Sequence, residues 1–429
     1  MNKGNPTKKV LVLGAGMAGL GAARTLQDAG VDVTVIEARS RVGGRTHTSH
    51  LWPDLPVDMG ASWIHGTIGN PVTQLAQDLG VKITTTCYKR SVTFDETGRQ
   101  IDFLPAVDCA MALIDAAREA AEGLDRDISL QAAIEALPDW QALSDGARGP
   151  LRLAINTRIE HEYSGDWSRL SAWHFDDGVD LPGDQAVVSP GFGPIITHLA
   201  QGLDLRLGEP VTAIAPTATG VKITTTRGIH TADHAIITLP LGVLQSGRIR
   251  FAEPLDSNRA RAIDRLGMGL LNKCVLRFDR PFWPNGVDWI DFLGPVDNLW
   301  ADWTSYLTAT GQPLLVGFNA AAMADEIEGL DDPGTTASAM SALRTMFGSG
   351  IPDPAGSQIS RWRQDPFAHG SYSFIPVGTC GKDRQALSGT DWDGRIAFAG
   401  EAASHEHPST VHGALITGRQ AARSFPGSP

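Results

Sequence analysis

The stretch KVLVLGAGMAGLGAARTLQDAGVDVTVIE, residues 9–37, decides the fold of this chain. It reads as a β-strand, a glycine-rich turn, an amphipathic helix over 18–29 and a second β-strand that ends in Glu37. The glycines of the turn have the spacing GxGxxG and are Gly14, Gly16 and Gly19. This succession within about 30 residues is typical of a unit that binds a dinucleotide. The sequence therefore predicts an α/β fold built on a Rossmann-like domain.

Each position in this unit has a physical task. Gly14 lets the chain turn sharply out of the strand, Gly16 leaves room for a pyrophosphate, and Gly19 lets the helix pack closely on the strand. The N–H groups and the positive dipole end of the helix would receive the pyrophosphate. The residues expected beside it at the start of the helix are Met17 and Ala18. Glu37 is placed to accept hydrogen bonds from a ribose without a 2′-phosphate. The unit alone does not decide between NAD and FAD.

The composition is that of an ordinary globular protein, with 42% hydrophobic and 20% charged residues, and 429 residues suffice for two or three domains. The formal net charge of −12 argues against nucleic acid and against an anionic membrane surface as partners, since both would repel the chain. It is compatible with a cationic small molecule that is drawn toward an acidic entrance. The four cysteines have no metal-ligand spacing, so free thiols and no metal site are expected.

The N-terminus combines lysines with an apolar run and so imitates a signal peptide. That run contains Gly14 and Gly16, and its removal would delete the dinucleotide site. No other stretch approaches the ~20 apolar residues of a membrane span. These features predict a cytoplasmic protein.

Two motifs after the acid introduce a family resemblance. RVGGR occupies residues 41–45, and DMGASWIHG occupies residues 58–66. In this order they resemble the FAD-dependent amine oxidases, a group that includes monoamine oxidases, polyamine oxidases and lysine-specific histone demethylases. The second motif is most similar to polyamine and spermine oxidases, and it implies that His65 faces a substrate tunnel. The cofactor contacts that the resemblance implies here are Ala38, Arg39, Gly44, Arg45, Gly60, Ala61, Ser62 and Trp63.

The run LNKCVLRF, residues 271–278, continues the resemblance. It reads as a strand of period two in which Lys273 lies between Leu271 and Val275 and faces inward. A buried lysine is unfavourable unless it is paired or used. The family uses a lysine at this position to hold a water against flavin N5, and it is our first candidate for a catalytic group.

The segment RWRQDPFAHGSYS, residues 361–373, resembles the part of the family that flanks the flavin. It implies that Trp362 packs near the ring and that Tyr372 forms one aromatic wall beside it. Ser371 stands where monoamine oxidases carry a cysteine bound covalently to FAD. Non-covalent FAD is therefore expected.

The C-terminal motif decides the cofactor. A strand that ends in Gly400 and Glu401 precedes STVHGA, residues 409–414, which opens a helix. This resembles the second FAD signature of the family, in which the acid and the helix N-terminus address the ribitol, the pyrophosphate and the flavin. The implied contacts are Gly400, Glu401, Thr410, Val411 and Ala414, with the backbone of Val211 against the adenine.

The resemblance covers residues 10–422 and implies the domain organisation. A Rossmann-like FAD-binding domain of the GR2 type, similar to p-hydroxybenzoate hydroxylase, would carry an inserted α+β substrate-binding domain. The expected ranges are 1–85, 190–265 and 376–429 for the FAD-binding domain, and 86–189 and 266–375 for the substrate-binding domain. Within them, 205–214 and 221–226 read as a β-hairpin, and 151–163 reads as one helix. Two acids of that helix, Glu160 and Glu162, are expected on a solvated face.

The resemblance implies an enzyme that oxidises a C–N bond of a spermine- or spermidine-type amine to an imine and reduces O2 to hydrogen peroxide. A small-molecule amine and O2 are thus the expected partners. Thr410 stands where monoamine oxidases carry their second cage tyrosine, which favours a polyamine oxidase. The catalytic candidates are Lys273, His65 and Tyr372. Whether Lys273 serves reoxidation or imine hydrolysis stays open.

Three alternatives stay open at this point. A histone demethylase shares the LNKxVLxFDRxFW and TVHGAL motifs, but 429 residues leave no room for its helical hairpin and N-terminal helical module. An amino-acid oxidase would need an arginine that grips a carboxylate, for which Arg158 and Arg361 are candidates. A non-enzymatic flavoprotein is disfavoured by the presence of Lys273 and Tyr372.

Overall fold

The computed structural model describes residues 8–425, and its first sheet has six strands. In spatial order these are β10 (Asp204–Arg206), β2 (Asp32–Ile36), β1 (Lys9–Leu13), β14 (His234–Ile237), β24 (Ile396–Phe398) and β23 (Gly389–Asp391). Neighbours pair in parallel except at the edge, where β23 runs antiparallel to β24. Strands from the start, the middle and the end of the chain therefore form one sheet.

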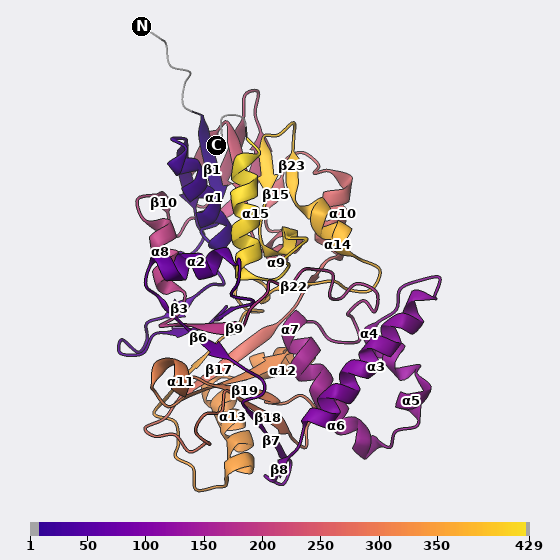
Figure 1. Cartoon of the computed structure of the whole chain (residues 1–429). Coiled ribbons are helices and arrows are strands. Elements are labelled where there is room, and N and C mark those ends of the chain that lie inside the picture. Colours follow the sequence, from indigo (N-terminus) through magenta and orange to yellow (C-terminus); the bar gives the residue numbers. More distant parts are fainter. Residues whose placement is uncertain (1–7, 426–429) are drawn as a thin grey trace.

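Successive residues of β1 point to opposite faces of the sheet, and each face has its own apolar core. Val10 and Val12 pack with four helices, α1 (Met17–Asp28), α2 (Pro71–Asp78), α8 (Gly193–Ala200) and α15 (Val411–Arg423). Leu11 and Leu13 pack with a second sheet, β13 (Ile229–Ala232), β12 (Val221–Thr225), β11 (Val211–Pro216) and β15 (Arg250–Phe251). Figure 1 shows α1 and α15 side by side in the upper half of the molecule.

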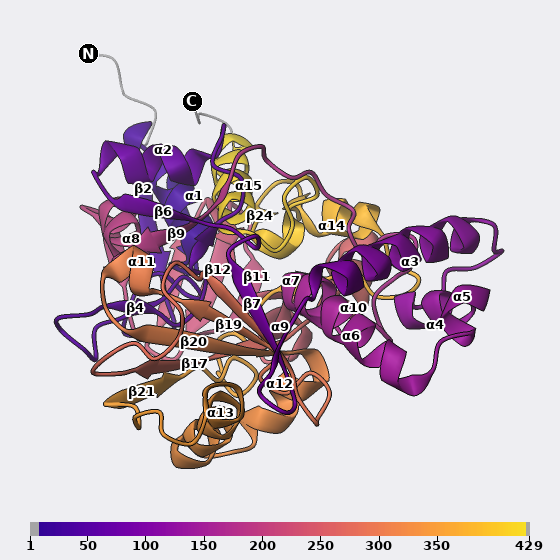
Figure 2. The same cartoon turned by 60° about the horizontal axis from the view of Figure 1, so that its bottom comes forward.

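A seven-stranded sheet forms the lower half of the molecule (Figures 1 and 2). Its order is β21 (Gly356–Ile359), β17 (Leu271–Arg277), β20 (Leu314–Ala320), β19 (Asp302–Ser305), β18 (Trp289–Leu293), β7 (Ser91–Asp95) and β8 (Gln100–Ile101). Neighbours are antiparallel except β18 and β7. Cys274 and Leu276 pack with helices α12 (Ala321–Glu328) and α13 (Asp332–Phe347), whereas Val275 faces the other way, toward Trp63.

A helical lobe lies to one side of this sheet (Figure 1). It comprises α3 (Leu104–Glu122), α4 (Leu130–Glu135), α5 (Pro138–Gln141), α6 (Asp145–Ile155), a π-helical turn (Asn156–Glu160) and α7 (His161–Tyr163). Its core is one apolar cluster that includes Ile114, Trp140 and Trp167. The π-helical turn adds a residue to the winding, as such turns do near functional sites, and it carries the chain from α6 to α7.

The remaining elements are short. They are β3 (Thr48–Ser49), β4 (Val57–Asp58), β5 (Trp63–Ile64), β6 (Lys82–Thr86), β9 (Gln185–Ser189), β16 (Gly267–Met268), β22 (Ser373–Phe374), α9 (Leu241–Gln245), α10 (Ser257–Arg265), α11 (Leu307–Thr310), α14 (Gly381–Leu387) and a 3-10 turn (Glu401–Ala403). The chain is thus a mixed α/β protein with parallel and antiparallel sheets. No helix within residues 8–425 is long and apolar enough to cross a membrane.

Two expectations about these elements are wrong. Residues 205–214 do not form one strand, because Gly208 with φ +66° and the proline that follows it break the run. Its first part is β10 in the parallel sheet, and only the second part, β11, forms the hairpin with β12. Residues 151–163 are helical, but the π-helical turn divides them into two α-helices.

Candidate functional site

A cavity of about 910 Å³ lies where the parallel sheet, the seven-stranded sheet and the helical lobe meet. It is lined by all but one of the residues predicted to bind the cofactor or to act in catalysis. Those that line it are His65, Lys273, Tyr372, Gly14, Gly16, Met17, Ala18, Glu37, Ala38, Arg39, Gly44, Arg45, Gly60, Ala61, Ser62, Trp63, Val211, Trp362, Gly400, Glu401, Thr410, Val411 and Ala414. The motifs are therefore brought together in space, although their contacts with a cofactor stay a prediction.

Gly19 is the exception, and its surroundings explain why it is a glycine. A Cβ at Gly19 would lie 1.9 Å from the carbonyl oxygen of Gly14, so only glycine allows the helix to pack this closely on the strand. Gly14 has φ +106°, which a side chain would strain. A Cβ at Gly16 would meet only the carbonyl oxygen of Gly43, at 3.9 Å. The space next to Gly16 is therefore part of the cavity and is not filled by protein.

The N-terminus of α1 is open toward this space. Its N-cap, Gly16, offers no side-chain acceptor, and the first turn contains no acidic residue. The free N–H groups and the positive end of the helix dipole can therefore receive an anionic group. This geometry fits a pyrophosphate on Met17 and Ala18, as the motif predicts.

The Glu37 carboxylate lies at the end of β2 and is buried. It accepts hydrogen bonds from the backbone N–H of Ala15 at 2.7 Å and of Arg39 at 2.8 Å. The Arg39 guanidinium pairs with Asp365 at 2.7 Å and lies over the Phe367 ring. These contacts hold the acid at the cavity wall, where its further lone pairs can accept from a ribose.

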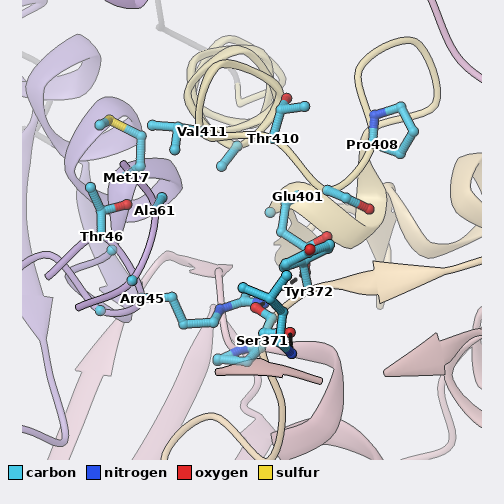
Figure 3. Close-up of a pocket in the computed structure, with 18 of the residues that line it drawn as sticks. Met17, Arg45, Thr46, Ala61, Ser371, Tyr372, Glu401, Pro408, Thr410 and Val411 are labelled. Atoms are coloured by element: carbon cyan, nitrogen blue, oxygen red, sulfur yellow. Dashed lines mark hydrogen bonds and ion pairs between the residues drawn. The ribbon is translucent and has the colours of Figure 1, made fainter. Parts of the chain in front are cut away.

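The C-terminal motif completes the opposite wall (Figure 3). Arg45 Nη1 donates to Glu401 Oε1 at 2.8 Å, and the Ser373 hydroxyl donates to Glu401 Oε2 at 2.6 Å. The buried Arg384 donates in turn to the Ser373 hydroxyl at 2.6 Å. Burial alone raises the pKa of Glu401, but the charges of Arg45 and Arg384 and these hydrogen bonds outweigh burial and lower it. Glu401 is therefore an ionised carboxylate with fixed orientation.

Helix α15 begins at this wall. The Thr410 hydroxyl accepts from the N–H of Gly413 at 2.9 Å and so caps the helix, while Val411 lies at its first turn beside the cavity. Figure 3 shows Val411 close to Met17, with Thr410 beside it at the start of α15. Two helix N-termini, those of α1 and α15, thus border the same cavity.

Lys273 lies on β17 and is only 4% exposed, so the expectation that it faces inward is confirmed. Its ammonium donates to the carbonyl oxygens of Asp58 at 3.0 Å and Gly60 at 2.6 Å, and to the Ser62 hydroxyl. Burial lowers the pKa of Lys273 to about 8, an effect that the Asp58 charge opposes. All three ammonium donors are used, so a water could be held only if Ser62, whose hydroxyl can rotate, gives up its hydrogen bond.

Aromatic side chains surround the lysine. Trp63 stacks on Trp289 with ring centroids 5.6 Å apart, and the Lys273 ammonium lies 5.7 Å from the Trp63 ring centroid and 6.0 Å from that of Phe318. The Tyr372 hydroxyl donates to the carbonyl oxygen of His161, which ties the aromatic wall to the helical lobe. Burial raises the pKa of Tyr372, so it stays a neutral phenol.

Trp362 and Ser371 take fixed positions at the same wall. The Trp362 indole donates to the Met59 carbonyl at 3.2 Å. The Ser371 hydroxyl accepts from the N–H of Leu271 at 2.8 Å, and its carbonyl oxygen accepts from Arg45 at 2.9 Å (Figure 3). The serine is thus bound to protein on both sides.

The expectation of a solvated Glu160 is wrong. Its side chain is 1% exposed. The buried carboxylate accepts hydrogen bonds from the Asn156 amide at 2.7 Å and from the Trp167 N–H at 3.0 Å. Glu162 is exposed as expected, yet it lines the cavity. Of the two arginines considered for a carboxylate, Arg158 lines the cavity. Arg361 does not, and it pairs with Asp332.

Several residues of the cavity wall were not predicted from the sequence. Asp302 on β19 is a charged residue within an apolar run. The same signal identified Lys273, so this reasoning could also have found Asp302. Arg384 lies in the polar run KDRQ and gives no such signal. Tyr88 stacks on Trp289 with ring centroids 4.6 Å apart, but it comes from a loop that is far from Trp289 in the sequence. Within residues 8–425, no group of three or more histidine, cysteine or acidic side chains is arranged to hold a metal ion.

Comparison with known proteins agrees with this geometry. The family of flavin-containing amine oxidoreductases matches residues 17–424. The chain therefore belongs to this family, and it is an FAD-dependent amine oxidase.

Individual relatives cover almost the whole chain. It is 36% identical to polyamine oxidase 4 of Oryza sativa subsp. japonica and 35% identical to polyamine oxidase 2 of Arabidopsis thaliana, in both cases over 96% of this chain and 87% of the relative. It is 31% identical to lysine-specific histone demethylase 2 of Homo sapiens, over 96% of this chain but 52% of that protein.

Proposed function

We propose that this chain is a polyamine oxidase that acts on a C–N bond of a spermine- or spermidine-type amine. The observation that carries the proposal is the continuity of the cavity, which joins both phosphate-facing helix N-termini to Lys273 and to a wall of aromatic and acidic side chains. The similarity to two proteins named polyamine oxidase supports the same substrate class. When bound, FAD supplies a two-electron acceptor for the hydride lost from the carbon next to nitrogen, and O2 reoxidises it with formation of hydrogen peroxide.

The residues around Lys273 would orient the amine and exclude water from it. Trp63 and Tyr372 offer flat apolar walls that favour a neutral nitrogen at the reacting carbon, while the acidic part of the cavity attracts the cationic remainder. His65 lies on the same wall and would contact the substrate. Lys273, with a pKa of about 8, can hold or move a proton near neutral pH. We assign it to the reaction without choosing between reoxidation and imine hydrolysis.

We further propose a GR2-type FAD domain and the domain ranges given above. The strands of the parallel sheet all lie in 1–85, 190–265 or 376–429, and those of the seven-stranded sheet all lie in 86–189 or 266–375. A three-stranded sheet crosses this division, since β9 pairs with β5 and β6, and β6 itself runs one residue past the boundary to Thr86. Arg45 and Glu401 would hold the flavin, and Ser371 would leave it non-covalent.

The net charge bears on the partners of this chain, and its cysteines bear on its location. With a net charge of −12, the chain would bind neither nucleic acid nor an anionic membrane surface. Its four cysteines are free thiols, which supports a reducing, cytoplasmic location.

The test is peroxide release from the purified yellow protein with separate substrates. We expect spermine or spermidine to react fastest, ahead of benzylamine, tyramine and amino acids. A methylated-lysine peptide is included because the demethylase relative matches 96% of this chain. Fastest turnover of that peptide, of a monoamine or of an amino acid would overturn the polyamine assignment.

A further inference from the structure

Five residues of the seven-stranded sheet form a straight row across neighbouring strands. Lys273 lies opposite Phe318, Phe318 opposite Asp302, Asp302 opposite Asp291, and Asp291 opposite Thr93. Residues directly opposite each other in a sheet point to the same face. Asp302 therefore shares the cavity face with Lys273, two strands away. At a strand spacing of about 4.8 Å, their backbones lie roughly 10 Å apart.

Asp302 has an unmet hydrogen-bonding capacity in this row. Its side chain is 3% exposed and borders the cavity. Oδ2 lies 3.5 Å from His161 Nδ1, which is the limit of a hydrogen bond, and Oδ1 has no partner within the described chain. A buried carboxylate oxygen without a donor is unfavourable, so a donor brought by a ligand would be bound well.

The charges around Asp302 favour a cation. Asp291 lies behind it, fully buried, with Arg158 Nη2 at 3.6 Å. Glu162 lies on the cavity wall nearby. Three acidic side chains thus face one guanidinium and the His161 imidazole, and burial raises the pKa of Asp291 to about 7, so Asp302 and Glu162 carry most of the negative charge. Burial, and then the neighbouring Asp302, raise the pKa of Tyr88, which lines the same cavity.

Stacked aromatic rings border the cavity beside this row. Trp63 stacks on Trp289 at 5.6 Å, and Trp289 stacks on Tyr88 at 4.6 Å. All three border the cavity. Such a wall accommodates a methylene chain and attracts an ammonium to its ring faces.

We propose that Asp302 binds a second, distal ammonium of the substrate while the reacting nitrogen lies near Lys273. The inference rests on the proposed function for its reaction, but the binding site is a separate claim. It makes Asp302 a specificity-determining residue, because an amine with one nitrogen leaves the buried carboxylate oxygen without a partner. Arg158 has an unpartnered Nη1 in the same region, so preference for a substrate with a distal carboxylate is the opposite outcome of the test.

The experiment measures binding without turnover. Holoenzyme is reduced with dithionite under nitrogen and titrated in a calorimeter with two ligands of equal chain length. Spermidine carries both terminal ammoniums, and N-butylpropylamine has the same secondary amine and carbon chain without them. In the wild-type protein, spermidine should bind at least about tenfold more tightly.

Asp302→Asn keeps the shape and removes the charge. It should raise the Kd for spermidine by about 10- to 100-fold and leave that for N-butylpropylamine within about threefold. The matched control is Asp332→Asn, an exposed acid outside the cavity, which should change neither Kd. Flavin content and thermal midpoint check that each variant is folded. If D302N does not fold, equal affinity of the wild-type protein for the two ligands would still overturn the assignment.

Equal weakening of both ligands by D302N, or no weakening of spermidine, would overturn the assignment of Asp302. So would tighter binding of an ω-amino acid than of spermidine, with loss of that preference in Arg158→Met. Spermidine binding that depends on Asp302 but gives no turnover in air would keep this inference and contradict the proposed function. If the protein turns spermidine over and D302N leaves that turnover unchanged, the proposed function is kept and the assignment of Asp302 is contradicted.

Discussion

The Arg45 guanidinium and the Glu401 carboxylate meet at 2.8 Å, although 356 positions separate them in the chain. Arg45 closes the RVGGR motif near the start, and Glu401 opens the C-terminal motif. Their contact joins the two dinucleotide motifs into one wall of the cavity (Figure 3). Since Arg384 approaches the same carboxylate through Ser373, one acid is held between two cations.

Replacement of Glu401 should destabilise the folded protein. Glu401→Gln leaves two guanidiniums without their anion and is expected to cost about 3–5 kcal/mol in the free energy of unfolding at pH 7. Exposed Glu253→Gln serves as the control and should be neutral. Urea unfolding of the flavin-saturated proteins measures both. A change below about 0.5 kcal/mol in E401Q would contradict this role.

The contact between Arg45 and Glu401 also predicts that the folded protein loses stability in acid. The folded-state pKa of Glu401 lies below its ordinary value, so its contribution to stability is present above that value, near pH 4.3. It is lost as the pH falls through the lowered folded-state pKa. The stability difference between wild type and E401Q should therefore be full at pH 7 and shrink below about pH 4. A difference that does not change over this range would contradict it.

Gly16 and Gly19 should respond differently to alanine. Gly19→Ala places a Cβ 1.9 Å from a backbone oxygen, and we expect little folded protein. Gly16→Ala meets no protein atom closer than 3.9 Å, so the fold should persist while the methyl group occupies cofactor space. Circular dichroism and FAD titration should show a native spectrum and an FAD Kd raised about tenfold or more for G16A. Unchanged FAD binding would remove Gly16 from the site.

The flavin should leave the protein intact on acid precipitation, because Ser371 offers no thiol for a covalent bond. Absorbance of the supernatant at the flavin maximum is the measurement. Flavin that stays with the precipitated polypeptide would show that another residue binds it covalently.

The sequence predicted which residues line the cavity better than it predicted their contacts. Glycines with fixed spacing, such as Gly14 and Gly19, have backbone requirements that a motif records directly. Lys273 could be placed inward because strand alternation fixes its face, but the three acceptors of its ammonium come from residues 58–62, and no local pattern identifies them. Asp302 shares the cavity face with Lys273, two strands away, because of the strand order, which the sequence does not state.

Lys273→Met should slow one half-reaction by about 10²–10⁴, the usual effect of a positioned proton-transfer group. Stopped-flow absorbance separates flavin reduction from reoxidation and identifies the step. The pH profile of that step in the wild type should show an ionisation near the pKa of about 8, which K273M lacks. Exposed Lys222→Met is the control and should behave as wild type. Normal rates in both half-reactions of K273M would make the lysine structural.

The most direct test of the central claim is anaerobic mixing of the yellow holoenzyme with single amines. We predict that spermine or spermidine bleaches the flavin absorbance fully, and that air restores it with one hydrogen peroxide per flavin. Benzylamine or tyramine should bleach it orders of magnitude more slowly. A flavin that stays oxidised with every polyamine, or that a monoamine reduces faster, would contradict the assignment of this cavity to polyamine oxidation.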